Sequence, residues 1–248
     1  MQSCFHHALF SKPTIQTKHF HVLTDAATLI HPTTIPLKHS SDLSRQIYED
    51  LGPRGLEHRT SPEADQITFD LVLKLIGDEP RRLLDAGCGY GRIAIPLAQR
   101  GFDIVGVDIS PSMLGEAHYR SGEAEVGIEW ILGDIATIPV ADESFDVVLC
   151  LWLTFHELLQ KKEQLRVLRE FQRVLKVGGI GLLDGPPFQK QGDDEPISGL
   201  VVPNEESEEE LAIVGFEPLL EEVGISKFEQ FVDDCPGRPR QFLRWWKT

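Results

Sequence analysis

The chain has 248 residues, of which 41% are hydrophobic and 25% are charged, and its formal net charge at pH 7 is −15. These proportions are typical of a globular protein with enough length for one sizeable α/β core. An excess of acidic residues opposes binding to a polyanion, so the composition argues against nucleic acid as a substrate or partner.

The cysteine pattern predicts a reduced protein. Cys4, Cys88, Cys150 and Cys235 form no C-x-x-C pair, so we expect no disulfide and a cytoplasmic location. No apolar run approaches the length of a membrane span and no signal-peptide pattern opens the chain, so no membrane contact is expected.

Residues 1–40 differ in composition from the remainder, because six of the nine histidines lie here among Thr, Ser and Pro, with a single acidic residue. Cys4, His6 and His7 have no second ligand cluster, so no metal site is expected. An organelle-targeting peptide is an alternative interpretation of this segment, because acidic residues are scarce in it, although the first arginine of the chain is Arg45. We expect a flexible or loosely packed extension.

Residues 41–78 are predicted to form an N-terminal helical cover. A short helix over residues 42–48 is expected to stop at Gly52. A second helix begins after the cap residue Ser61, carries acids in its first turn, and ends at Gly77.

The stretch RLLDAGCGYGR reads as a strand, a glycine loop and the start of a helix. Residues 82–84 form a short buried strand, and Gly87, Gly89 and Gly91 follow at alternate positions. Glycines let the backbone turn sharply and let a ligand lie against it, while the following helix presents free N–H groups. The stretch therefore predicts a cofactor-binding loop.

The third glycine separates two classes of cofactor. A dinucleotide fingerprint, G-x-G-x-x-G, would need glycine where Arg92 stands. Here the third glycine is Gly91, and Asp85 closes the strand with a carboxylate that would repel a pyrophosphate but suits a ligand carrying an ammonium and a sulfonium. The stretch resembles motif I of the class I S-adenosylmethionine (SAM) dependent methyltransferases.

Two later strand ends extend this resemblance. Asp103–Asp108 is a β-branched strand whose final carboxylate is placed to accept both ribose hydroxyls of an adenosine. A third strand over residues 128–132 precedes Asp134 and Ile135. The resemblance implies that Asp134 faces the adenine amino group and that Ile135 covers the ring.

The fourth strand, Phe145–Cys150, is apolar on both faces and is therefore expected at the centre of the sheet. Methyl transfer is an in-line displacement that needs alignment, an aromatic wall and, for a protonated nucleophile, a base. After this strand, His156 is a candidate base and Glu157 a candidate group to orient it. The alternatives are a packed histidine and a helix-capping glutamate.

The resemblance implies a set of cofactor-binding residues: Asp85, Gly87, Cys88, Gly89, Gly91, Asp108, Ile109, Met113, Asp134, Ile135 and Leu151. Arg59 is a candidate partner of the SAM carboxylate. Four residues are candidate acceptor-binding residues: Tyr48, Trp152, Phe155 and Phe188. For Arg59 and Tyr48, a solvated arginine and a packing tyrosine stay open as alternatives.

The C-terminal half completes the predicted sheet. Residues 161–176 form an amphipathic helix, and the sequence RVLKVGG resembles the RVLKPGG that precedes the fifth strand of many small-molecule methyltransferases. Residues 186–210 are expected to form an acidic loop or lid. A helix over residues 208–223 and two closing strands over 225–232 and 241–246 follow.

We therefore expect a doubly wound α/β fold in residues 79–248, with a mostly parallel seven-stranded sheet, helices on both faces and an antiparallel C-terminal hairpin. The expected function is SAM-dependent methyl transfer to an oxygen or nitrogen of a small molecule. The alternatives are a non-catalytic SAM-binding or regulatory protein and a nicotinamide-dependent oxidoreductase.

Overall fold

The computed structural model describes residues 40–58, 61–158, 160–185, 216–233 and 240–248. It also describes four two-residue strands: β6 Gln189–Lys190, β7 Pro196–Ile197, β8 Leu200–Val201 and β9 Ile213–Val214. Residues 1–39 of the extension predicted for residues 1–40, and most of the predicted acidic loop, lie outside the described residues, whereas Ser40 is helical.

Seven strands form one sheet in the order β10-β11-β5-β4-β1-β2-β3. Their bounds are β1 Arg82–Ala86, β2 Asp103–Asp108, β3 Glu129–Leu132, β4 Phe145–Cys150, β5 Leu175–Gly185, β10 Phe228–Asp233 and β11 Arg240–Trp246. Strands β1 to β5 pair in parallel, whereas β11 pairs antiparallel with both β5 and β10. The predicted mostly parallel sheet with an antiparallel C-terminal hairpin is confirmed.

Helices cover both faces of this sheet, as expected of a doubly wound fold. The helices are α1 Ser40–Glu57, α2 Pro62–Ile76, α3 Ala94–Gln99, α4 Pro111–Glu123, α5 Lys161–Val174 and α6 Phe216–Glu222, with a 3-10 turn, η1, at Thr154–Glu157. Adjacent side chains of a strand point to opposite faces. Leu83 therefore joins the buried cluster of α2 and α3, and Leu84 joins that of α5 and α6.

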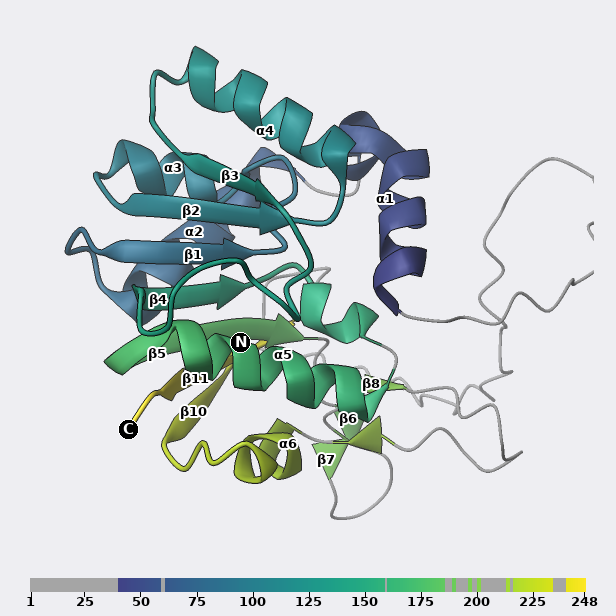
Figure 1. The fold of residues 1–248 in the computed structure, drawn as a ribbon, viewed down its shortest axis with the longest axis vertical. Coiled ribbons are helices and arrows are strands. Elements are labelled where there is room, and N and C mark those ends of the chain that lie inside the picture. The colour runs from purple at the N-terminus through teal and green to yellow at the C-terminus, as the bar shows by residue number, and fades with distance from the viewer. Residues whose placement is uncertain are drawn as a thin grey trace, which may run out of the picture. The chain divides into compact units, whose positions relative to one another are not determined.

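The strands β1, β2 and β4 all point toward the side of the molecule on which α1 lies (Figure 1). Helix α1 also packs against α4. Among the described residues, no helix combines the length and the apolar character that crossing a membrane requires.

Several element boundaries differ from the prediction. Residues 213–214, expected within a helix over residues 208–223, form strand β9, and helix α6 begins at Phe216. The expected stop of the first helix at Gly52 is present as a break, because Gly52 has a non-helical φ of +62° and ψ of 169°, and α1 comprises two helical segments that meet at this kink. Helix α5 ends at Val174, two residues early, because Leu175 already pairs with Phe145 of β4 and begins strand β5.

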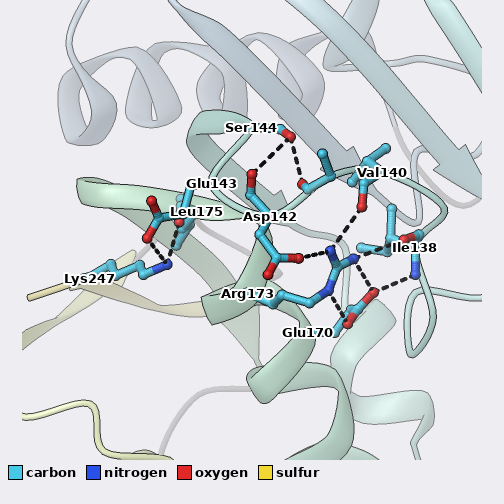
Figure 2. A network of polar contacts seen from close by, with 10 residues as sticks. Ile138, Val140, Asp142, Glu143, Ser144, Glu170, Arg173, Leu175 and Lys247 are labelled. Carbon is cyan, nitrogen blue, oxygen red and sulfur yellow. Dashed lines mark hydrogen bonds and ion pairs between the residues drawn. The ribbon is translucent and has the colours of Figure 1, made fainter.

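Arg173 of α5 fixes the loop that joins β3 to β4 (Figure 2). Its guanidinium donates to the carbonyl oxygens of Ile138 and Val140, both at 2.9 Å, and to the carboxylates of Asp142 and Glu170. Glu170 accepts in turn from the Ile138 N–H at 2.7 Å. Hydrogen bonds to Glu170 and Asp142 raise the pKa of Arg173. The loop is held by the hydrogen bonds that this cation donates to two of its carbonyls and to Asp142.

Two glycines offer a matched test of how strand β5 packs against Trp245 of β11. A Cβ at Gly181 of β5 would lie 2.0 Å from the ring of Trp245, which is fully buried and has no room to move. We expect Gly181→Ala to lower the free energy of unfolding by about 1–3 kcal/mol, measured by urea denaturation. In helix α4, a Cβ at Gly115 would have no neighbour within 4 Å. There Gly115→Ala should stabilise by about 0.5–1 kcal/mol, and equal effects of the two changes would contradict the packing described.

Candidate functional site

A cavity of about 490 Å³ opens at the carboxyl ends of β1, β2, β3 and β4. Strand β1 has β4 on one side and β2 on the other. The strand order therefore reverses at β1, and the connections that leave in opposite directions leave a crevice between them. Ligand sites in proteins commonly have volumes of about 300–1,000 Å³. The topology and the size both point to a small-molecule site.

The glycine loop forms one wall of the cavity. The N–H groups of Gly87 and Cys88 donate to the carbonyl of Val107 in β2, at 2.8 and 3.1 Å. Gly87 has a φ of +80°, and a Cβ there would lie 2.4 Å from Thr154 Cγ2. The loop is therefore held against β2 in a conformation that only glycine adopts without strain.

Asp108 joins this loop to the next strand. Its Oδ2 accepts from the Gly89 N–H at 2.7 Å, and its Oδ1 accepts from the Ser110 N–H at 2.9 Å. Burial raises the pKa of Asp108, although these backbone N–H groups oppose the rise. A carboxylate can accept about four hydrogen bonds. Asp108 can thus hold the loop and also accept from the hydroxyls of a ligand.

Asp85 is a buried carboxyl group at the end of β1 that lines the same cavity. Burial, and next the nearby charge of Asp108, raise its pKa to about 7, whereas Arg92 lowers it. A carboxyl group in this position gains most from a ligand that brings a positive charge into the cavity.

Two arginines that the sequence analysis did not assign to the site also line the cavity. The guanidinium carbon of Arg92 lies 3.9 Å from the ring centroid of Trp152, and that of Arg240 lies 4.4 Å from the same centroid. Arg92 Nη1 is also 3.3 Å from Asp65. Arg92 appeared in the sequence only as a departure from a dinucleotide motif. Arg240 carried no signal, because only tertiary structure brings it to the strand ends.

Trp152 and Leu153 have left-handed backbones, with φ values of +60° and +69°. Such values are uncommon for residues other than glycine and cost free energy. The fully buried carboxylate of Asp184 accepts from the N–H groups of both residues, at 2.8 Å for Leu153. Arg240 pairs with Asp184 at 2.9 Å. Asp184 therefore holds the turn that brings Trp152 to the cavity.

Helix α1 approaches the cavity through polar side chains. Ser41 donates to Asp134 Oδ2 at 2.7 Å, and Tyr48 donates to Glu157. Glu49 accepts from Ser110. The helix is thus held by groups that themselves lie on or beside the cavity wall.

Most of the predicted site residues are brought together in this cavity. It is lined by Tyr48, Asp85, Gly87, Cys88, Gly89, Asp108, Ile109, Met113, Asp134, Ile135, Leu151, Trp152 and Glu157. The first three strand-end acids and the glycine loop therefore share one site, as the convergence of parallel strands predicts.

Other predicted residues lie elsewhere. Gly91 faces Trp130 and Ile95, since a Cβ there would lie 2.9 Å from the Trp130 ring. Phe155 is buried in the core with α5 and α6. Arg59 and Phe188 lie outside the described residues.

His156 lies beside the cavity lining, not in it. Its ring contacts Phe216 edge-on at 5.5 Å between centroids, and a Cβ at Gly185 would lie 2.4 Å from its Cε1 atom. Burial lowers its pKa to about 4, opposed by a hydrogen bond with the backbone of Asp184. The imidazole is therefore neutral near pH 7 and a weaker base than a solvated histidine.

Residues 83–179 match the family model of a methyltransferase domain. Over 117 residues the chain is 32% identical to the ubiquinone biosynthesis O-methyltransferase of Methylobacterium nodulans, a match that covers 44% of this chain and 47% of that protein. The chain thus spans about half the length of the relatives that it matches.

Solved structures agree on the fold. The magnesium protoporphyrin IX methyltransferase of Synechocystis with bound SAM has a TM-score of 0.60 at 19% identity, over 84% of this chain and 97% of that one. The 1,6-didemethyltoxoflavin-N1-methyltransferase of Burkholderia thailandensis, with bound 1,6-didemethyltoxoflavin and S-adenosylhomocysteine (SAH), has a TM-score of 0.61 at 18% identity. That match covers 90% of this chain and 93% of that one.

The cavity fits SAM on its own chemistry. Its carboxyl groups can accept from hydroxyl, amino and ammonium groups, and Gly89 leaves the loop open, because a Cβ there would have only Leu56 within 4 Å. Within the described part of the chain, no group of three or more His, Cys, Asp or Glu side chains could hold a metal ion.

The pKa of Asp85 predicts how SAH binding changes with pH. The carboxyl is protonated below about 7 and ionised above it, and Asp85 is a predicted cofactor-binding residue whose ionised form alone would pair with the SAH ammonium. We expect the dissociation constant, measured by calorimetry, to fall as the pH rises from 6 to 8, by up to about tenfold per unit. Asp85→Asn should bind more weakly and without this slope. An unchanged slope in the variant would contradict the assignment.

The raised pKa of Asp85 also predicts that the stability of the fold falls as the pH rises, whereas SAH binding strengthens. Because folding raises the pKa of Asp85 from 3.8 to about 7, its contribution to stability is lost as the pH rises through that range. Asp85→Asn should therefore raise the melting temperature by a few degrees at pH 8 and by less at pH 5.

Proposed function

We propose that this chain, which carries a class I SAM-dependent methyltransferase domain, is an enzyme that transfers a methyl group to an oxygen or nitrogen of a small-molecule acceptor. The observation that carries the proposal is that the glycine loop and three strand-end acids line one cavity. The name of the ubiquinone biosynthesis O-methyltransferase and the 1,6-didemethyltoxoflavin bound to the structural neighbour both concern small molecules, which supports this acceptor class. The net charge of −15 supports it too, because it opposes nucleic acid.

Each part of the cofactor has a partner in the proposed site. Asp108 accepts from the ribose hydroxyls, Asp134 accepts from the adenine amino group, and Ile135 covers the adenine ring. When bound, SAM supplies an electrophilic methyl group on a sulfonium sulfur. The role of these residues is to hold that methyl group in line with the acceptor.

Asp85 and Arg92 suit the amino-acid end of the cofactor. The two side chains are near enough for Arg92 to lower the pKa of Asp85, and both line the cavity. A carboxylate beside a guanidinium matches an ammonium and a carboxylate on one carbon atom. We assign Arg92 to the cofactor carboxylate, the role that the sequence analysis gave to Arg59.

Glu157 has a better position than His156 for taking a proton from the acceptor. Its side chain lines the cavity and accepts from the hydroxyl of Tyr48, whereas His156 is half-buried beside the cavity and has a lowered pKa. A positioned base contributes about 10²–10⁴-fold to the rate of such reactions. We propose Glu157 as the base and Tyr48 as the residue that orients it.

Calorimetry with SAH and with NAD tests the cofactor assignment. SAH should bind and NAD should not, and Asp108→Ala should weaken SAH binding by at least about 100-fold, because it removes charge-assisted hydrogen bonds. Asp103→Ala is the matched control, since Asp103 lies at the other end of β2 and is largely exposed. Absence of SAH binding by the wild-type protein would overturn the proposal.

Turnover separates the two base candidates. Screening small metabolites with labelled SAM supplies an acceptor, after which Glu157→Gln should lower kcat by about 10²-fold or more with SAH affinity unchanged. His156→Ala should retain SAH binding and most of kcat. The reverse pattern would transfer the role to His156, and normal turnover in both variants would exclude a side-chain base at this position.

A further inference from the structure

Three acids of the cavity lie on one half of the sheet together with Arg92, and Arg240 lies on the other half together with Glu157. The acids Asp85, Asp108 and Asp134 follow β1, β2 and β3, whereas Arg240 begins β11 and Trp152 follows β4. In the sheet order, β1, β2 and β3 lie on one side, and β4, β5 and β11 lie on the other. The acidic half matches the hydroxyl, amino and ammonium groups of the cofactor. The half of the cavity that contains Arg240 is then available to the methyl acceptor.

Arg240 is a buried cation in a fixed position. Its side chain is 10% exposed, and it donates to Asp184 at 2.9 Å and to the hydroxyl of Thr68. The indole of Trp152 lies beneath its guanidinium, which fixes the plane of the group. A guanidinium has five N–H donors, and these two hydrogen bonds use two of them.

Trp152 presents a second donor at the same place. Its Nε1 atom is buried and has no hydrogen-bond partner among the described residues, and the residue lines the cavity. A buried N–H without a partner costs free energy, so a ligand that supplies an acceptor here is favoured. The strained turn that aims this side chain is retained by Asp184, which accepts from both of its N–H groups. Strain of this kind is typical of ligand-binding positions.

We infer that Arg240, together with the Trp152 N–H, binds a carboxylate group of the methyl acceptor. A carboxylate has two oxygens in a plane that matches the guanidinium, and its lone pairs can accept from both donors. An acceptor of this class enters from the β4–β5–β11 half and reaches the methyl group beside Glu157. This inference rests on the proposed function, because it takes the acidic half as the cofactor site.

The test uses a library of small carboxylic acids, each paired with its primary amide, and the full-length protein saturated with SAH. Thermal shifts identify binders, and calorimetry measures their affinities. Acids should dominate the binders, with each amide at least tenfold weaker than its acid. Arg240→Gln should remove this preference while SAH affinity stays within about threefold, and Arg244→Gln should retain it. Arg244 is the matched control because it lies on the same strand and does not line the cavity.

Further variants keep the test decisive if Arg240→Gln fails to fold. Arg240→Lys keeps the charge without the planar fork, and Asp184→Asn with Arg240→Gln removes both members of the buried pair. Both should bind SAH and show a reduced preference for acids. Binding of amides as tightly as acids, no acid among the binders, or loss of SAH affinity in a folded Arg240 variant would each overturn the inference. Failure of the wild-type protein to bind SAH would instead overturn the proposed function.

Discussion

The carboxylate of Asp108 links the two segments on which the site depends. One oxygen holds the Gly89 N–H of the glycine loop, and the other holds the Ser110 N–H at the start of α4. The carboxyl ends of β1 and β2 are therefore fixed relative to each other, beside the point where the strand order reverses. The same carboxylate is buried, and its pKa is raised. Its ionised form therefore lowers the stability of the fold, although it is the form that accepts hydrogen bonds most strongly.

Other residues of the cavity also lower the stability of the fold. Asp85, with a pKa near 7, is costly to ionise without a cationic ligand, and two non-glycine residues after β4 have left-handed backbones that Asp184 and Arg240 retain. The buried charges of Asp85 and Asp108 and the left-handed turn at Trp152 and Leu153 all lie at the carboxyl ends of the strands. The apolar clusters on the two faces of the sheet supply the stability that tolerates them.

The sequence predicted the sheet architecture and the convergence of the strand-end acids and the glycine loop, because both depend on local patterns. Strand-end acids and alternating glycines have fixed spacing, and parallel strands must bring them to one edge. The part of the cavity that contains Arg240 could not be predicted in this way. Arg240 reaches Trp152 only through the antiparallel pairing of β11 with β5, and the turn at Trp152 depends on Asp184, 32 positions later in the chain. Likewise, Gly91 matches the motif by spacing, yet its backbone faces Trp130.

A crystal structure of the SAH complex tests the central claim most directly. The account predicts the ribose hydroxyls on Asp108, the adenine between Asp134 and Ile135, and the amino-acid end between Asp85 and Arg92, with the space beside Trp152 and Arg240 left for the acceptor. SAH bound outside this cavity, or with its amino-acid end against Arg240, would contradict it.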